Sequence, residues 1–561
     1  MFEDADNFAD IFRGGLPYYL LITLPILIIC STNPVLASSE FGVQRMSQFD
    51  VHGVNYGCRA SAINLEAKSL YTWSTARHCV VTRFQDMTIE QFHEIRANAG
   101  GLVILLPEDV SFLSAEEKEY LCLLEQAMMS QVSTIPIYFS QYNKDLKKVI
   151  DDITHNIDAK TSPNTRESAL SEIINSISAN GYQIVVSGSS HIPNKQSKVP
   201  IIQGELAPLK NLKAGDGDVS NKLPLIIVVA HLNTFGLYNE YMANSDVAVF
   251  MSLADLFSKL HNTANAVPKH RIMFLLSESG PLLNFQGMKK WLDENTQNML
   301  DSEFIKICEY FQNVDFVLCL DTISQPFGEP SDSLYMHVSK PPKEGTPMSN
   351  FYKQLKNVSA RYNNVTVEGV HKKINLADVL LAWEHERFSM KRFPAFTLST
   401  LKTHKEPVRT TIFKGNEAEI LRNTQKNAKI LAEALVGYVF NIEEEELLSG
   451  ALDISEDFVK PWMHVKSAFH NNDLKNAFEK YLKNVKIIYE KPDTRDPDFM
   501  LYEGQDADLF VYRVKPAVFD LFLTLVISAY LGSAYLLIQY FPYLYMMVCM
   551  LSKRPAKIKS H

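Results

Sequence analysis

The chain has 561 residues, of which 46% are hydrophobic and 21% charged, and at roughly 100–200 residues per domain this length predicts about three domains. Its 55 basic and 64 acidic side chains leave a net charge of −9, which argues against direct binding to nucleic acid. A mean hydropathy of −0.09 excludes a polytopic membrane protein but is compatible with one or two apolar segments.

The first apolar segment lies near the N-terminus. It runs from Leu16 to Cys30 and is followed by the sequence VLAS at 35–38. An apolar run before a small-residue cleavage site is typical of a secretory signal peptide, to which we assign residues 1–37. An uncleaved signal anchor is the alternative, because acidic residues outnumber Arg13 ahead of the apolar run.

The second apolar segment lies near the C-terminus. The run Leu521–Phe541 is long enough to cross a hydrocarbon core of ~30 Å, and Pro542 is expected to end or kink the helix. We therefore predict a transmembrane helix over 516–542. The tail over 543–561 is basic and has no acidic residue, so the positive-inside rule places it in the cytosol and the body in the lumen, as in a type I single-pass protein.

Two Asn-x-Ser/Thr sequons agree with a lumenal body. They begin at Asn357 and Asn364, which we predict to be glycosylated. The cysteines include no CxxC pair. Cys58 and Cys79 either form a disulfide or remain free thiols, and the sequence leaves both alternatives open.

The region between the two apolar segments alternates apolar runs with helical patterns. In residues 38–209, short runs such as Gly101–Leu106 predict the strands of a smaller α/β lobe. In residues 210–441, helical patterns separate continuous apolar runs that are typical of strands buried on both faces: Leu225–Ala230, Ile272–Leu276, Phe316–Leu320 and Pro394–Leu398. This alternation predicts an α/β fold with a doubly wound, mainly parallel sheet. Residues 442–515 are predicted to form a membrane-proximal helical region.

Polar residues follow the predicted strands, at the ends where open α/β sheets bind ligands. His231, the pair Ser277-Glu278 and Asp321 each follow a strand, and His404 lies in the loop after the fourth. This set resembles the ligands of the di-zinc aminopeptidases, which read H-x-D, then G-A-x-D-N-x-S-G, then E-E, followed by an Asp and a late His. The resemblance implies a fold of the di-zinc aminopeptidase type.

Three positions that two-zinc chemistry needs hold other residue types. Asn233 replaces the acid of H-x-D, Met242 falls on the bridging aspartate, and Ser277 falls on the general base; a gap in the alignment would offer Asp246 as the bridge. Because this chemistry requires a bridging carboxylate and a general base, we predict no catalytic residue, no metal and no cofactor. A single retained ion is the alternative, held by His231, Glu278, Asp321 and His404.

Several sequence strings are more specific than any fold motif. They are Phe285–Gly287, Phe316–Thr322 (FVLCLDT), His337–Pro342 (HVSKPP), Val370–Glu386 (VHKKINLADVLLAWEHE) and Tyr512–Asp520 (YRVKPAVFD). On these strings, and on the order of its segments from signal to tail, the chain resembles the nicalin family, whose members are relatives of nicastrin.

That resemblance implies a non-enzymatic scaffold subunit, a pseudo-aminopeptidase, in the endoplasmic-reticulum membrane. The family works with the Nodal modulator protein and transmembrane protein 147 in a complex that joins the ribosome-bound Sec translocon and assists the insertion of multi-pass membrane proteins. It is also linked to antagonism of Nodal signalling. The alternatives are an active lumenal zinc aminopeptidase and a nicastrin-like substrate-gating subunit of an intramembrane protease.

Overall fold

A computed structural model describes Ile26 and residues 39–552 except for a set of short gaps. The gaps are 159–180, 189–191, 195–197, 207–222, 234–235, 239–243, 262–267, 298–312, 327–331, 363–364, 414, 443–447, 466–472, 492–494, 496, 503–504 and 515–516. The predicted signal segment, apart from Ile26, lies outside the described residues, and so does Asn364.

Eight strands form the larger of the sheets, in the order β15-β14-β16-β13-β11-β12-β10-β17. The central strands β12, β11, β13 and β16 are parallel. At one edge β10 and β17 join in antiparallel pairing, and at the other the parallel pair β14 and β15 runs antiparallel to β16. The bounds are β10 Val199–Glu205, β11 Leu225–His231, β12 Arg271–Ser277, β13 Val314–Leu320, β14 Ser333–Val338, β15 Thr366–His371, β16 Ala395–Ser399 and β17 Lys483–Glu490.

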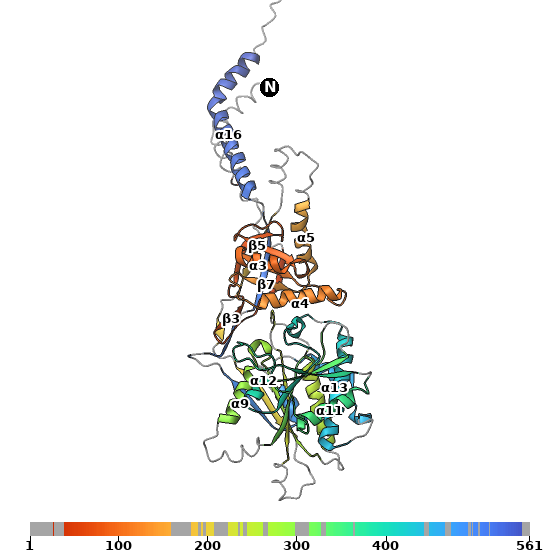
Figure 1. Ribbon diagram of the computed structural model, residues 1–561. Coiled ribbons are helices and arrows are strands. Elements are labelled where there is room, and N and C mark those ends of the chain that lie inside the picture. The colour runs from red at the N-terminus through yellow and green to blue at the C-terminus, as the bar shows by residue number, and fades with distance from the viewer. Residues whose placement is uncertain are drawn as a thin grey trace, which may run out of the picture.

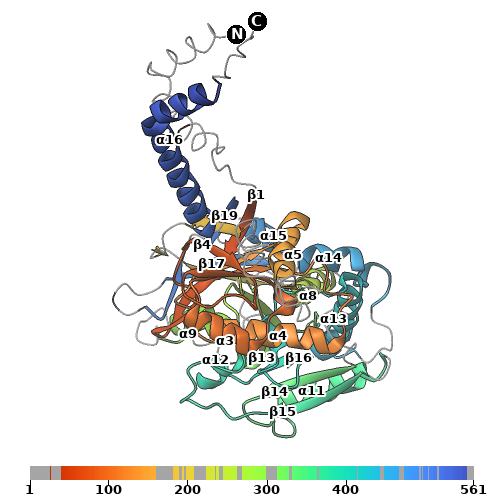
Figure 2. The same cartoon turned by 90° about the horizontal axis from the view of Figure 1, so that it is seen from above.

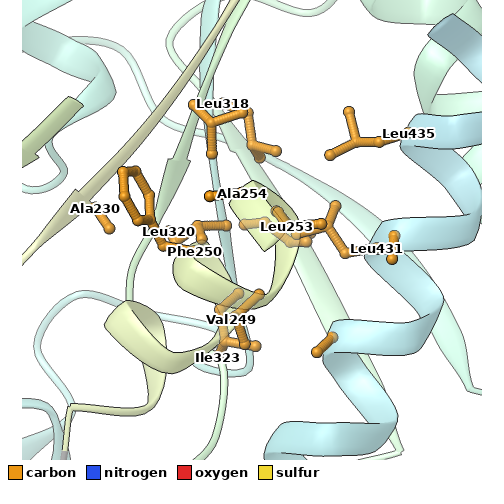
Figure 3. Packing of buried hydrophobic residues seen from close by; sticks show 14 of the residues in the cluster. Ala230, Val249, Phe250, Leu253, Ala254, Leu318, Leu320, Ile323, Leu431 and Leu435 are labelled. Carbon is orange, nitrogen blue, oxygen red and sulfur yellow. The ribbon is translucent and has the colours of Figure 1, made fainter. Parts of the chain in front are cut away.

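Helices cover both faces of this sheet, which confirms the predicted doubly wound, mainly parallel α/β fold. Alternate strand residues face opposite sides, so Ile226 and Val228 pack against α8 (Ser245–His261), α11 (Pro347–Ser359) and α13 (Glu417–Phe440). Figure 3 shows side chains of β13, α8 and α13 meeting in this core. On the other face, Leu225 and Ile227 pack against α9 (Gln286–Gln297) and α12 (His385–Met390).

Seven strands close into a barrel in the order β1-β19-β8-β4-β5-β6-β7. Six of these strands lie in residues 38–209, where the smaller lobe was predicted, together with helices α3 (Ile89–Asn98), α4 (Ala115–Met129) and α5 (Lys144–Asp158). The predicted bounds differ from the structure in two strands: β10 lies inside 38–209 but joins the larger sheet, and β19 comes from the C-terminal part of the chain. Its strands are β1 Ser39–Arg45, β4 Ala62–Lys68, β5 His78–Arg83, β6 Gly101–Leu105, β7 Ile137–Ser140, β8 Gly181–Ser187 and β19 Asp506–Val514. A small sheet of β3 (Val54–Gly57), β2 (Gln48–Val51), β18 (Phe499–Tyr502) and β9 (Pro193–Asn194) accompanies it.

The predicted helical region over 442–515 is wrong in its second half. Helices α14 (Glu456–Met463) and α15 (Asp473–Tyr481) are present, but β17, β18 and β19 follow them and join three different sheets. Strand β19 pairs with β1, more than 450 residues away in the chain. Local periodicity carries no information on such distant pairing, which is why these strands were not predicted. Because β17, β18 and β19 join three sheets, the chain passes through both lobes again before it reaches the membrane helix.

Helix α16 (Ala517–Ser552) projects from the barrel, and the barrel lies between α16 and the larger sheet (Figure 1). Its segment Leu521–Tyr540 is long and apolar enough to cross a membrane, and no other helix among the described residues meets that test. The helix continues past Pro542, which excludes the predicted end at this residue but not the predicted kink; the bounds 516–542 of the transmembrane segment remain a prediction. Figure 2 shows α16 changing direction in its last part, as expected of a proline inside a helix.

Candidate functional site

Three ionisable side chains meet at the carboxyl ends of the parallel strands. His231 is the last residue of β11, Asp321 follows β13, and Asp246 lies in the first turn of α8; all three are buried, and a ligand atom of each lies within 4.8 Å of the others. The sequence predicted His231 and Asp321 at this site. It offered Asp246 as the bridging aspartate only with a gap in the alignment. Met242, which falls on that position without a gap, lies outside the described residues.

A glutamate that the sequence analysis missed orients His231. The Nδ1 atom of His231 lies 3.2 Å from Oε2 of Glu384, and both side chains are at most 1% exposed. In metal sites, a carboxylate on the far ring nitrogen fixes the orientation of a histidine ligand. Glu384 therefore supplies the carboxylate that Asn233 lacks. The backbone N–H of Asn233 donates to the side-chain oxygen of Asn244.

An arginine that the sequence analysis also missed neutralises Asp321. The Arg409 guanidinium donates to both carboxylate oxygens, from Nε at 3.2 Å and from Nη2 at 2.5 Å, and the two side chains are buried. The guanidinium also lies over the Trp383 ring at 4.4 Å and donates to the carbonyl of Ala382. Because arginine stays charged at every physiological pH, the chain itself provides a permanent cation for this carboxylate.

Asp246 is committed to the backbone. Its two oxygens accept the N–H groups of Thr322 and Ile323, each at 2.7 Å. Thr322 has a φ of 52°, in the left-handed region, where a β-branched residue is strained. The Asp246 carboxylate thus holds the strained turn that follows Asp321.

The charges of the site shift one another's pKa values. Burial, together with the neighbouring charge of Asp321, raises the pKa of Asp246 to about 6. Burial also acts on Asp321, but the Arg409 charge overcomes it and holds the pKa of that carboxyl below its usual range. Burial alone would lower the pKa of His231, whereas the hydrogen bond with Glu384 and the charge of Asp321 raise it above the ordinary value.

The residue at the general-base position has a structural role. The Ser277 hydroxyl is hydrogen-bonded to the Ser279 hydroxyl at 2.8 Å, and Ser279 Oγ accepts the N–H of Gly287. A Cβ atom on Gly287 would come within 2.2 Å of Ser277 Oγ, so a glycine is required there. These contacts anchor the turn that precedes α9.

The same turn places an aromatic ring against His231. Asn284 and Phe285 have φ values of 51° and 53°, two successive non-glycine residues in the left-handed region, which is uncommon. The Phe285 ring meets the His231 ring edge-on, with centroids 5.6 Å apart, and lies 5.9 Å from the Arg409 guanidinium. Phe285 therefore packs directly against the residue that would bind a metal.

The alternative single-ion site is not assembled from its four predicted ligands. His231 and Asp321 come together, but among the described residues Glu278 and His404 are not members of the cluster. Glu278 is buried. His404 packs near Trp383, and burial with the charges of Lys372 and Arg409 lowers its pKa to about 4.

The residues present do not fit two zinc ions. Asp321 is paired with an internal cation, the oxygens of Asp246 accept backbone N–H groups, and a hydroxyl stands where a general base is needed. A dication beside the Arg409 guanidinium would also be repelled by it. The site is chemically a closed network of buried charges.

The segment that carries Arg409 also joins the two lobes. Arg409 belongs to the 3-10 helix η3 (Pro407–Thr410), and the residues after it enter the barrel lobe. There the buried Glu125 of α4 accepts hydrogen bonds from the Thr411 hydroxyl at 2.7 Å and the Ile412 N–H at 3.0 Å. Phe413 packs into the apolar cluster of that lobe. The charged site therefore fixes the loop on which the barrel lobe docks.

Two further sequence predictions concern surface and thiol chemistry. Cys58 and Cys79 are both free and buried, which rules out the disulfide between them. Asn357 lies on the exposed side of α11. Its glycosylation remains a prediction.

Comparisons with known proteins place this fold and site. No family model matches the chain. The crystal structure of nicastrin, the γ-secretase component, matches with a TM-score of 0.51 and 10% identity, and the match covers 84% of this chain and 99% of that one. The molecule is thus a protein of nicastrin-type fold, and its described residues include one candidate membrane-spanning helix.

The sequence relatives are more specific. The BOS complex subunits named ncln from Danio rerio and NCLN from Homo sapiens are each 33% identical to the chain, over 97% of its length and 98% of theirs. Nicalin from Caenorhabditis elegans is 25% identical over 94% of the chain and 96% of its own length. The chain belongs to the NCLN, or nicalin, family, as its sequence strings indicated.

Proposed function

We propose that this protein is a non-catalytic subunit of a membrane complex of the endoplasmic reticulum, equivalent to the BOS complex named for its relatives. Its partners in this proposal are the Nodal modulator protein, transmembrane protein 147 and the ribosome-bound Sec translocon, and its role is to assist the biogenesis of multi-pass membrane proteins. The observation that carries the non-catalytic part is the Arg409–Asp321 ion pair, because it occupies the carboxylate that a metal would need.

The proposed topology is type I, with the body in the lumen. Both sequons lie in the body, and the tail after α16 is basic, with Lys553, Arg554, Lys557 and Lys559 and no acidic residue. Cells should therefore contain a form whose mobility changes on glycosidase treatment and no longer changes when Asn357→Gln and Asn364→Gln are combined. Digestion of the body by protease added to sealed microsomes would contradict this topology.

The assembly is tested with the intact protein. Purification from endoplasmic-reticulum membranes in mild detergent should recover the proposed partners in stoichiometric amounts, and depletion of the protein should lower the levels of multi-pass membrane proteins. In depleted cells, His231→Gln is compared with the wild type for its ability to restore these levels. Glutamine keeps a hydrogen-bond donor for Glu384 but removes the metal-binding nitrogens of the histidine.

We expect this variant to restore those levels as well as the wild type does. Restoration that depends on His231 would favour the zinc aminopeptidase. Recovery of an intramembrane protease in place of the proposed partners would favour a substrate-gating subunit.

A further inference from the structure

The barrel closes through a short pairing between β1 and β7, which we call the seam. Strand β1 pairs with β19 at six positions, from Ser39 opposite Val511 to Gln44 opposite Asp506. With β7 it pairs at only two, Gln44 opposite Phe139 and Arg45 opposite Tyr138, and β7 ends one residue later. Among the residues that the structure describes, no strand therefore pairs with most of β1 on its β7 side.

The direction of the backbone groups identifies which residues face that opening. The Arg45 N–H donates to the Gln505 carbonyl at the β19 edge, and the Met46 N–H donates to the Ile137 carbonyl at the β7 edge. Backbone groups alternate sides along a strand, so those of Gly42 and Glu40 point to the β7 side, beyond the end of β7. An unpaired strand edge of this kind is a template for another strand.

A hollow of about 350 Å³ lies over the same part of β1. Gly42 is at its floor, and a Cβ atom built there would touch no atom within 4 Å. Because a glycine has no side chain to fill the space above the strand, the hollow gives direct access to the backbone beside the seam.

The walls of the hollow are acidic on one side and aromatic on the other. Asp506 and Asp508 of β19 line the first wall; Asp506 accepts a hydrogen bond from Gln44 at 3.0 Å, whereas the Asp508 side chain is exposed. Tyr238, which reaches the hollow from the larger lobe, lines the second; its side chain is buried, its ring stacks on Phe139, and its hydroxyl accepts a hydrogen bond from Gln141. Exposed carboxylates beside a strand edge are suited to a lysine or arginine side chain.

We propose that this seam groove, formed by Gly42, Gln44, Gln141, Tyr238, Asp506 and Asp508, binds an extended basic segment of a partner protein. The segment adds a strand to the open edge of β1 and places a lysine or arginine side chain beside the exposed Asp506 and Asp508. Main-chain hydrogen bonds provide affinity in such strand addition, and side-chain pockets provide specificity. This inference goes beyond the proposed function and does not depend on the identity of the complex.

The test uses the full chain in detergent and two short fluorescent peptides, one of alternating valine and lysine and one of alternating valine and glutamate. The basic peptide should bind and the acidic one should not. Asp508→Lys reverses the charge of the groove and Gly42→Trp fills it, so each should weaken binding by about tenfold or more. Gly42→Ala and Glu94→Lys, an exposed charge reversal on α3, are the matched controls and should bind as the wild type does.

Hydrogen exchange distinguishes strand addition from simple charge attraction. On binding of the basic peptide, the amides of Glu40 and Gly42 should become protected in the wild type and stay unprotected in Asp508→Lys. Binding without this protection, equal binding to Asp508→Lys, or no binding of either peptide overturns the proposal. Self-association of the wild type that Gly42→Trp abolishes would also overturn it, because the occupant would then be a second copy of the chain.

Discussion

Arg409 determines whether the Asp321 carboxylate, at the carboxyl ends of the parallel strands, is available to bind a metal ion. It pairs with Asp321 inside the protein, where neither charge is screened by water. Arg409→Gln would leave the Asp321 carboxylate buried without a cation, which typically costs about 3–5 kcal/mol. We therefore expect this variant to lower the melting temperature of the full chain strongly, and the double variant Arg409→Gln with Asp321→Asn to recover much of the loss.

The matched control for this prediction is an ion pair at the protein surface with one largely exposed partner. Lys426 lies 3.0 Å from Asp332, which is largely exposed, so Lys426→Gln should cost less than about 1 kcal/mol. If Arg409→Gln lowered the melting temperature no more than Lys426→Gln does, the Arg409–Asp321 ion pair would not be important for the stability of the fold. A double variant that is less stable than Arg409→Gln alone would lead to the same conclusion.

Glu125 predicts a pH dependence at the junction of the lobes. Burial raises its pKa from 4.5 to about 8, although Thr411 and Ile412 donate to its oxygens. The unfolded chain therefore loses this proton at lower pH than the folded chain. For this group, the free energy of unfolding falls as pH rises from 4.5 to about 8, by at most about 1.4 kcal/mol per pH unit.

Glu125→Gln should remove that dependence. The amide oxygen can accept the Ile412 N–H and the amide nitrogen can donate to the Thr411 hydroxyl, so both contacts survive without a buried charge. We expect the variant to melt at higher temperature than the wild type near pH 8, with a difference that shrinks toward pH 5. Melting curves that keep a constant separation across this range would contradict the prediction.

Some residues of the site could be predicted from the sequence and others could not. His231 and Asp321 were predictable because they follow short apolar runs that are typical of buried strands. Glu384 and Arg409 lie in connecting segments without periodicity and reach the site from residues far along the chain. Their spatial roles depend on folding of the whole lobe, so neither could be assigned from local pattern.

The same distinction holds for whole elements. The apolar runs at 225–230, 272–276 and 316–320 became β11, β12 and β13 because a parallel strand covered on both faces must be apolar throughout. Strands β17 and β19 are not apolar throughout, because exposed and half-buried residues are mixed with a few buried ones. Their partners β10 and β8 lie more than 250 residues earlier. Their pairing is set by the tertiary fold, which explains why 442–515 was predicted as helical.

Helix α16 predicts a contact inside the membrane. Ser528 and Gly532, together with Ala529 and Ser533, form an exposed strip of small side chains at i and i+4 spacing. Such strips let helix backbones approach closely in lipid. If the strip packs on a multi-spanning partner, Ser528→Leu combined with Gly532→Leu should release that partner on purification, while membrane integration survives because the helix becomes more apolar.

Ala534→Leu is the control for this strip. It makes the same small-to-large change two residues beyond Gly532, on a different side of the helix, and should leave the partner bound. Unchanged recovery of the partner with the double variant would mean that the body alone holds the complex. Loss of the partner with Ala534→Leu would mean that the strip has no special part in the contact.

At the scale of the whole molecule, the charged site and the membrane helix belong to one continuous arrangement. The barrel lies between α16 and the larger sheet (Figure 1), and the loop that follows Arg409 docks on the barrel through Glu125. Figure 2 shows α11, β14 and β15 on the opposite side of the body from α16. The charged site at the strand ends is thus linked, through Arg409 and the loop that follows it, to the contact between the two lobes.

The most direct test of this account is the metal content and peptidase activity of the full-length protein. We predict that protein purified in mild detergent holds less than one equivalent of zinc after dialysis against zinc. We also predict that it hydrolyses no amino-acyl substrate, with zinc present or absent, because Arg409 occupies Asp321 and Ser277 cannot act as a general base. Two bound equivalents of zinc, with hydrolysis that disappears in His231→Ala, would contradict the account.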